Sequence, residues 1–198
     1  MTEDNMKKLF IPIILGTARQ GRESEKVAKW ILKKVSEHPE IETRIFDPRE
    51  MDYDFQDEGQ NLKEKNTDYR DAIIRADGLI VIVPEYNRGY PGSLKMILDT
   101  LLKEYIHKPV ATVGVSSGII GGARVIENLL PVYRELGLMA SFTDLFFPKV
   151  KTKFDEKGNL EEEEKYNKRF YGFITELLWV AKTLKWGREN VESKYHPN

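Results

Sequence analysis

The chain contains no cysteine and only three histidines among its 198 residues. The absence of cysteine excludes disulfides, thiolate nucleophiles, Cys-type zinc sites and iron–sulfur clusters, so redox chemistry would need a bound organic cofactor. His38, His107 and His196 lie far apart, and none has a second histidine or a carboxylate at the spacing of a metal-ligand pair. We therefore predict no metal site.

The chain also has no excess charge of either sign and no long apolar run. It carries 31 Lys and Arg against 32 Asp and Glu, so no overall field favours nucleic acid or an anionic membrane. No apolar run has the length of a membrane span, and residues 1–5 lack the basic and apolar segments of a signal peptide. These absences predict a cytoplasmic protein whose partners are selected by local sites.

The chain does show a regular alternation of apolar runs and amphipathic stretches. The pattern predicts strands at 9–15, 41–46, 79–83, 110–115 and 138–147, separated by helices, with a C-terminal helix at about 161–186. We expect Gly78 to close a helix over 68–76 in a left-handed conformation, and Pro131 to kink or break the helix that begins near 122. The acidic stretch 47–66 is expected to be a surface excursion. The length fits one domain over 1–198.

Five strands alternating with helices are typical of the α/β class, with a parallel sheet covered on both faces. Right-handed crossovers favour a doubly wound five-stranded sheet of order 2-1-3-4-5. In that order the carboxyl ends of the first, third and fourth strands are neighbours. Each of these strands is followed by a turn that carries glycine, at 16–24, 84–92 and 116–122. We predict that the three turns form one site for a phosphorylated, planar cofactor.

The first turn joins a strand to a helix, where free N–H groups and the positive end of the helix favour an anion. Gly16 and Gly21 have the Walker A spacing, but Arg22 and Glu23 stand where Lys and Ser or Thr are needed, which disfavours a nucleoside triphosphate. The candidate phosphate donors are Thr17, Arg19, Arg22 and Ser24. A helix cap with solvated arginines is the structural alternative.

The second turn places an acidic, an aromatic and an amide side chain directly after the central strand. Pro84, Glu85, Tyr86 and Asn87 suit the face and rim of a heteroaromatic ring, although a rigid strand-to-helix connection explains the turn equally well. No G-x-G-x-x-G motif is found in the first or third turn, which weakens a dinucleotide-binding interpretation.

The third turn has two alternative interpretations. Residues 114–118 match the G-x-S-x-G pattern of a serine hydrolase with Ser116 as nucleophile, but the only later histidine is His196, the third residue from the end of the sequence. Alternatively, Ser116, Ser117 and Gly118, with Gly121 and Gly122, form a nest of main-chain donors that a ligand can approach closely. Such a nest suits a reduced flavin, which carries negative charge at its N1 to C2=O edge.

Together the three turns resemble those of the NADPH-dependent FMN reductase family, which includes chromate and quinone reductases and azoreductases. The resemblance covers about residues 8–145. It rests on Gly16-Thr17-x-Arg19, on the Pro84-Glu85-Tyr86-Asn87 segment with Pro91-Gly92-x-Leu94-Lys95, and on Gly118-x-x-Gly121-Gly122. It implies a flavodoxin-like fold and a cytoplasmic flavoprotein that forms a homodimer or homotetramer.

The resemblance also implies FMN as cofactor and NADPH or NADH as electron donor. A hydride would pass from NAD(P)H to N5 of FMN and then to a second acceptor by a ping-pong route. That acceptor would be a quinone, azo dye, nitroaromatic, metal oxyanion or free flavin. No catalytic side chain is expected, because the flavin performs the chemistry. The implied FMN contacts are Gly16, Thr17, Arg19, Gly21, Arg22, Ser24, Pro84 to Asn87, Ser116, Ser117, Gly118, Gly121 and Gly122. A flavodoxin-type electron carrier, reduced by a partner protein, is the main alternative function.

Overall fold

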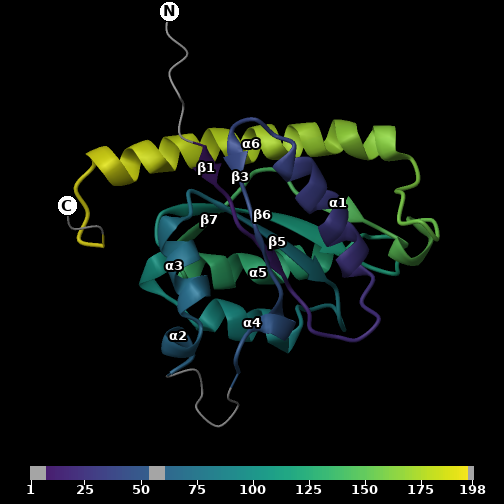
Figure 1. Ribbon diagram of the computed structural model, residues 1–198, viewed down its shortest axis with the longest axis horizontal. Helices are drawn as coiled ribbons and strands as arrows, with labels where there is room; N and C mark the ends of the chain where they lie inside the picture. Colours follow the sequence, from purple (N-terminus) through teal and green to yellow (C-terminus); the bar gives the residue numbers. More distant parts are fainter. Residues whose placement is uncertain (1–7, 54–60, 196–198) are drawn as a thin grey trace, which may run out of the picture.

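The computed structural model describes residues 8–53 and 61–195 and is a three-layer sandwich with a parallel sheet in the middle (Figure 1). The strands are β1 (Leu9–Phe10), β2 (Ile13–Leu15), β3 (Ile41–Glu42), β4 (Ile45–Phe46), β5 (Leu79–Pro84), β6 (Lys108–Val115), β7 (Leu138–Ala140) and β8 (Leu145–Phe147). The α-helices are α1 (Ser24–Ser36), α2 (Leu62–Lys65), α3 (Thr67–Arg75), α4 (Gly92–Asp99), α5 (Ala123–Glu135) and α6 (Glu163–Asn190). Short 3-10 helices occur at η1 (Pro48–Glu50), η2 (Lys103–Tyr105) and η3 (Val150–Thr152).

The sheet confirms the predicted doubly wound order. Its strands run β4-β2-β5-β6-β7, with β8 also paired to β6, and all of these pairings are parallel. Three of the five expected strands are interrupted. The first breaks into β1 and β2 at Pro12, which has no N–H to donate, the second breaks between β3 and β4, and the last breaks between β7 and β8. Counted as five, the order is 2-1-3-4-5.

Alternate residues of the central strands supply two hydrophobic cores. On one face, Ile80 and Ile82 pack with α1 and the long helix α6, and on the other face Val81 and Val83 pack with α3, α4 and α5. Every residue of β5 and β6 is buried, as expected for strands that are covered on both faces. The two cores hold the sheet between the helices, and the order of its strands determines which turns are neighbours at its carboxyl edge.

Two local expectations were wrong. Gly78 does not adopt a left-handed conformation, because helix α3 ends through the extended backbone of Ala76. Glycine is favoured at position 78 by space, since a Cβ there would lie 3.1 Å from Cγ of Pro109. Helix α5 continues through Pro131, so the predicted break is wrong, whereas the predicted kink stays a prediction. The expected surface excursion at 47–66 contains η1 and α2, and its residues 54–60 lie outside the described part of the chain.

Candidate functional site

The three predicted turns meet in one cleft at the carboxyl edge of the sheet. They follow β2, β5 and β6, which are adjacent strands. A cleft of about 230 Å³ lies between them. The predicted site residues that line it are Arg19, Gly21, Arg22, Ser24, Pro84, Glu85, Tyr86, Ser116 and Ser117. The doubly wound topology therefore brings residues that are about 100 positions apart in the sequence to one place.

The start of helix α1 offers unused polar groups to this cleft. No side chain caps the helix, and its first main-chain bonds run from Glu25 and Lys26 N–H groups to the carbonyls of Arg22 and Glu23. The hydroxyl of Ser24 is buried and has no hydrogen-bond partner among the described residues. Gly21 takes a φ of 63° with open space around it. An anion at this position would accept from groups that the protein leaves unsatisfied.

Thr17 and Tyr86 connect the first turn to the second. The Thr17 hydroxyl lies 3.2 Å from the Tyr86 hydroxyl and accepts a hydrogen bond from the Arg19 N–H at 3.3 Å. The Arg19 guanidinium lies 5.7 Å from the centre of the Tyr86 ring, and its side chain remains accessible from the cleft. Gly16 packs inward, because a Cβ at this position would meet the Ile82 carbonyl oxygen at 2.9 Å.

Arg22 is buried beneath the first turn and already has protein partners. Its guanidinium forms two hydrogen bonds with the Asp47 carboxylate and donates to the Thr17 carbonyl oxygen at 2.5 Å. Burial alone would lower the pKa of Arg22, but the hydrogen bond and charge of Asp47 more than offset it and raise that pKa. The same pair lowers the pKa of Asp47 despite its burial. The arrangement suits a structural role for Arg22 better than a direct phosphate contact.

The second turn is a tight hairpin. Tyr86 and Gly89 exchange main-chain hydrogen bonds of 2.9 and 2.8 Å, and Asn87 and Arg88 between them both have positive φ. These values are those of a type I′ turn, in which asparagine is favoured. Asn87 is exposed and is not among the residues that line the cleft. The hairpin thus presents Tyr86 from a rigid support.

Glu85 lies at the other end of the same turn and is only partly paired. One carboxylate oxygen accepts from Arg124 at 3.1 Å, while Oε2 is buried without a hydrogen bond. Its main-chain N–H donates to the Val115 carbonyl oxygen at 2.9 Å, which fixes the turn against β6. A ligand with an N–H donor would satisfy the free oxygen.

The third turn is held by the segment that follows β8. Ser116 N–H donates to the Phe147 carbonyl, and the Val150 N–H donates to the Ser116 carbonyl. The Ser116 hydroxyl donates to the Gly118 carbonyl oxygen at 3.1 Å. Neither His38 nor His107 lines the cleft, and His196 lies outside the described residues. Ser116 therefore has no observed base.

Gly121 and Gly122 serve the packing of the protein itself. They take φ values of 71° and 92°, and a Cβ on Gly122 would lie 2.7 Å from the Val115 nitrogen. A Cβ on Gly121 would lie 2.9 Å from Cβ of Phe146. Only Gly118 of the three is exposed with space around it. A role for Gly121 and Gly122 beside a ligand remains a prediction, but their close approach to β6 and β8 already requires glycine.

The structure places several residues at the cleft that were not among the predicted site residues. Val150 and Lys151 of η3 line the cleft, and Asp47 and Arg49 support the first turn from the segment after β4. The basic run 149–153 directly after a strand was the available signal for Lys151. Asp47 and Arg49 also follow a strand that neighbours β2, and this position in the sheet order was the only hint of their role.

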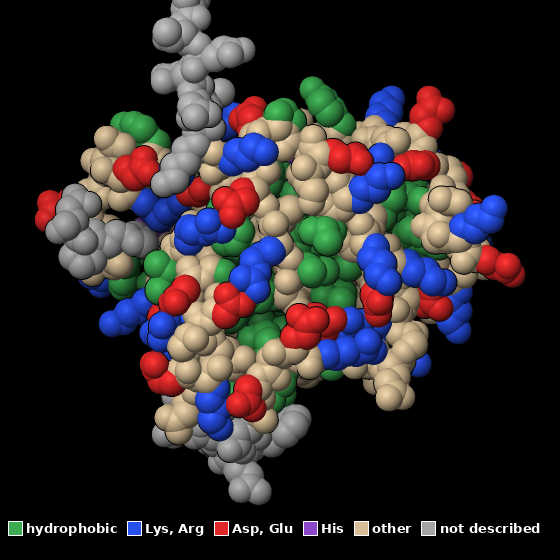
Figure 2. All heavy atoms as spheres, viewed as in Figure 1, with side chains coloured by type: hydrophobic (Ala, Val, Ile, Leu, Met, Phe, Trp, Pro, Cys, Tyr) green, Lys and Arg blue, Asp and Glu red, His purple; other side chains and the backbone are tan. Residues whose placement is uncertain are grey.

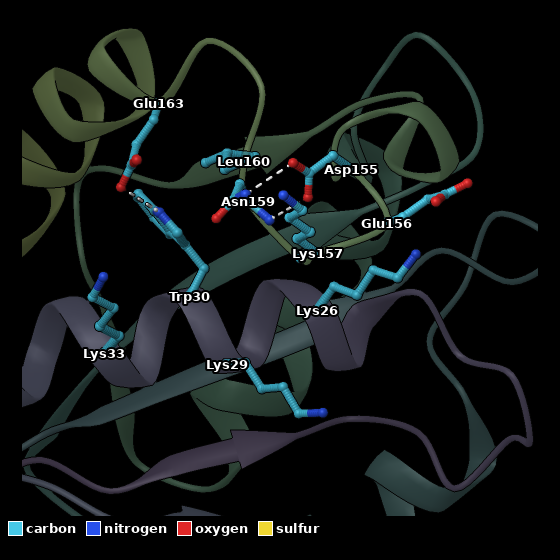
Figure 3. A pocket seen from close by; sticks show the side chains of 11 residues that line it. Lys26, Lys29, Trp30, Lys33, Asp155, Glu156, Lys157, Asn159, Leu160 and Glu163 are labelled. Atoms are coloured by element: carbon cyan, nitrogen blue, oxygen red, sulfur yellow. Dashed lines mark hydrogen bonds between the residues drawn. The ribbon is translucent and has the colours of Figure 1, made fainter.

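A second pocket, of about 450 Å³, lies between α1 and the turn that precedes α6 (Figure 3). Trp30 Nε1 donates to Glu163 at 3.4 Å, and Asp155 accepts from Asn159 at 2.8 Å across the turn. Lys26 of this pocket pairs with Glu23, the residue before α1, and Lys29 pairs with Glu25 of α1. None of the predicted site residues lines it, so we assign the chemistry to the cleft between the three turns.

Charges of both signs are interspersed over the face of the molecule seen in Figure 2, with no large area of a single sign. Among the described residues, no helix is long and apolar enough to cross a membrane. In the same part of the chain, no group of three or more His, Cys, Asp or Glu side chains is placed to hold a metal ion.

Comparison with known proteins supports the predicted resemblance. The sequence profile described as NADPH-dependent FMN reductase matches residues 10–150. An FMN-dependent NADPH-azoreductase of Staphylococcus haemolyticus is 29% identical over 131 residues, which are 63% of this chain and 69% of the relative. A 2-hydroxy-1,4-benzoquinone reductase of a Burkholderia species is 32% identical over 124 residues, which are 58% of this chain and 67% of the relative.

Solved structures show the same fold. The flavoenzyme FerB, an NAD(P)H:(acceptor) oxidoreductase from Paracoccus denitrificans, superposes with a TM-score of 0.70 at 22% identity, covering 88% of this chain and 98% of that chain. An NADH:FMN oxidoreductase in its apo form superposes with a TM-score of 0.69 at 19% identity, covering 96% of this chain and 94% of that chain. At these identities the likeness concerns the fold alone.

Proposed function

The chain belongs to the NADPH-dependent FMN reductase family, and on that premise we propose that the cleft between the three turns binds FMN and serves NAD(P)H:acceptor oxidoreduction. FMN is the cofactor of this family, and NADPH or NADH is the electron donor. The observation that carries the proposal is the convergence of the three turns on one cleft with unsatisfied polar atoms. The proposal treats residues 1–198 as a single flavin-binding domain.

The residues present fit FMN at both ends of the cleft. At the phosphate end, Arg19 supplies charge and the N-terminus of α1 supplies main-chain donors, and the Ser24 hydroxyl has no hydrogen-bond partner among the described residues. Pro84, Glu85 and Tyr86 of the second turn and Ser116 and Ser117 of the third turn also line the cleft, and we assign them to the ring of the flavin. We assign Thr17 to holding Tyr86 in place, and Arg22 to supporting the loop from below.

When bound, FMN supplies two-electron chemistry that accepts a hydride from NAD(P)H and passes the electrons to a second acceptor. The protein supplies position, through the rigid Tyr86–Gly89 hairpin and the fixed third turn. We propose a ping-pong route, in which the donor and the acceptor would use the same face of the bound flavin one after the other. No described side chain needs to move a proton in this scheme.

The acceptors named for the relatives suggest the class of oxidant. The two relatives above are named for azo and quinone reduction. We propose a quinone or azo compound as acceptor, with nitroaromatics, metal oxyanions and free flavin as further candidates. Dependence on NAD(P)H and the lack of cysteine fit a cytoplasmic enzyme, which is part of the proposal.

We also propose a homodimer or homotetramer. Helix α6 buries one face in the core, while Tyr171, Trp179 and Trp186 on another face are 72%, 65% and 62% exposed. Aromatic side chains are enriched at protein interfaces relative to the rest of the surface. Light scattering should give at least twice the chain mass of 23.0 kDa, and a Trp179→Glu, Trp186→Glu double variant should lower it. A single-chain mass for the unmodified protein at working concentration would contradict the assembly.

The proposed function is tested with purified protein. It should be yellow, or become so with added FMN, and its flavin absorption should bleach anaerobically on addition of NADPH or NADH. Initial rates against NADPH at several quinone concentrations should give parallel double-reciprocal lines, whereas intersecting lines would contradict the ping-pong route. Failure to bind FMN would contradict the site itself. A flavodoxin-type carrier would bind FMN but show no steady turnover with NAD(P)H and a quinone.

A further inference from the structure

Two arginines hold three consecutive carbonyl groups of the first turn. Arg22 Nη1 donates to the Thr17 carbonyl oxygen at 2.5 Å. Arg49, from η1, donates through Nε to the Ala18 carbonyl oxygen at 3.0 Å and through a second guanidinium nitrogen to the Arg19 carbonyl oxygen. Hydrogen bonds from Arg22 and Arg49 thus hold the carbonyl groups along one side of this loop, and Arg49 comes from a segment outside both β2 and α1.

This grip determines the direction of the N–H groups of the loop. In a planar trans peptide the C=O of one residue and the N–H of the next point in opposite directions. Fixing the carbonyls of residues 17–19 therefore turns the N–H groups of residues 18–20 to the opposite side. That side is the cleft side, because the Arg19 N–H donates to the Thr17 hydroxyl, which in turn meets the Tyr86 hydroxyl at the cleft.

The charges of the two arginines are balanced within the same cluster. Asp47 pairs with Arg22 through both carboxylate oxygens and also accepts from the Arg49 N–H at 2.9 Å. Glu25 lies 3.5 Å from Arg22 Nε and 3.7 Å from a guanidinium nitrogen of Arg49. Glu25 also pairs with the exposed Lys29 at 3.0 Å. Because the two carboxylates largely offset the charges of Arg22 and Arg49, we expect the cluster to act on an anion in the cleft mainly through the shape of the loop.

We propose that Arg49 is a positioning residue, which orders the N–H groups of the first turn around the FMN phosphate without touching it. The inference rests on the proposed FMN site. It predicts that Arg49 governs the preference for FMN over riboflavin, which lacks the phosphate. Arg49 differs in this from Arg19, whose guanidinium lines the cleft itself.

The test compares the dissociation constants of FMN and riboflavin, measured by quenching of flavin fluorescence. Arg49→Ala should weaken FMN binding about tenfold while riboflavin binding stays within about twofold. The expected loss is the lower end of the roughly 10- to 100-fold cost of removing a residue that orients the ligands of a metal ion. Arg49→Lys should not restore FMN affinity, because an ammonium group cannot bridge two carbonyls as the guanidinium fork does.

Arg44→Ala provides the matched control. Arg44 lies between β3 and β4, five positions before Arg49. It pairs with Asp68 through hydrogen bonds of 2.8 and 2.6 Å and does not line the cleft. This variant should leave both dissociation constants unchanged. Urea unfolding of all variants shows whether each of them is folded. If Arg49→Ala does not fold, the comparison of FMN and riboflavin binding is made with Arg49→Lys, which also lacks the guanidinium group.

Three outcomes would overturn the inference. Unchanged FMN affinity in Arg49→Ala shows that the grip is not needed. Equal losses for FMN and riboflavin assign Arg49 to the fold alone, and full recovery in Arg49→Lys makes it a charge contact to the phosphate. These outcomes differ from failure of the proposed function, in which the unmodified protein itself binds no FMN.

Discussion

Arg19 and Arg22 are three positions apart, yet the same substitution should affect different properties of the protein. Arg19 is exposed at the cleft, 5.7 Å from the centre of the Tyr86 ring, and forms no ion pair with any described residue. The Arg22 side chain is only 3% exposed and bonds to Asp47 and the Thr17 carbonyl. Arg19→Ala should therefore change ligand binding, and Arg22→Ala should change stability.

The structure allows both effects to be estimated. A charge-assisted contact from Arg19 to a phosphate is worth about 1.5–3 kcal/mol, so Arg19→Ala should weaken FMN binding at least about tenfold and leave riboflavin binding nearly unchanged. Removing one member of a buried ion pair costs about 3–5 kcal/mol. Because the Asp47 side chain keeps 18% exposure, we expect Arg22→Ala to lower the free energy of unfolding by roughly 2–4 kcal/mol.

Flavin fluorescence titration and urea unfolding of the two variants separate the effects. Arg19→Ala should unfold within about 0.5 kcal/mol of the unmodified protein, as exposed substitutions usually do. Equal losses of FMN and riboflavin affinity in Arg19→Ala would refute its phosphate role. An Arg22→Ala variant with unchanged stability and selectively weakened FMN binding would show that Arg22 contacts the phosphate after all.

Three further predictions follow from individual contacts. Gly122→Ala should lower the free energy of unfolding by about 2 kcal/mol or more, since its Cβ would lie 2.7 Å from the Val115 nitrogen, whereas Gly118→Ala should leave it unchanged in the same urea titration. Ser116→Ala should retain NAD(P)H:quinone activity, and the unmodified protein should show no esterase activity. Burial lowers the pKa of Lys108 to about 7. The charged form is therefore disfavoured in the folded state, and this penalty should disappear as the pH rises from 7 towards 10.5. Relative to Lys108→Met, the unmodified protein should gain on the order of 3 kcal/mol of stability over that range, and a pH-independent difference in urea unfolding would contradict the burial of the charge.

The fold could be predicted because the central strands β5 and β6, which are buried on both faces of the sheet, are largely apolar in the sequence. Residues 79–83 contain no polar side chain, and the structure buries all of β5 against helices on both faces. The interruptions in the other strands were less visible. Pro12 lies within a continuous apolar run, and residues 141–144 separate β7 from β8 although both pair with β6. An apolar run predicts that a segment is buried. It does not predict where the strand is interrupted, because this depends on which main-chain N–H and C=O groups form hydrogen bonds with the neighbouring strands.

The roles of the arginines could not be predicted for a related reason. A basic residue in a glycine-bearing turn before a helix indicates anion binding, and this inference gave Arg19 and Arg22 the same role. The sequence does not show that Asp47, 25 positions away, competes for Arg22 in the folded protein. That competition arises because β4 lies beside β2 in the sheet, so the segment after β4 packs under the turn after β2. The turn after β2 is thus supported by side chains from the segment after β4, its neighbour in the sheet. In a parallel sheet, residues that support a ligand-binding turn should therefore be sought in the segment that follows the adjacent strand.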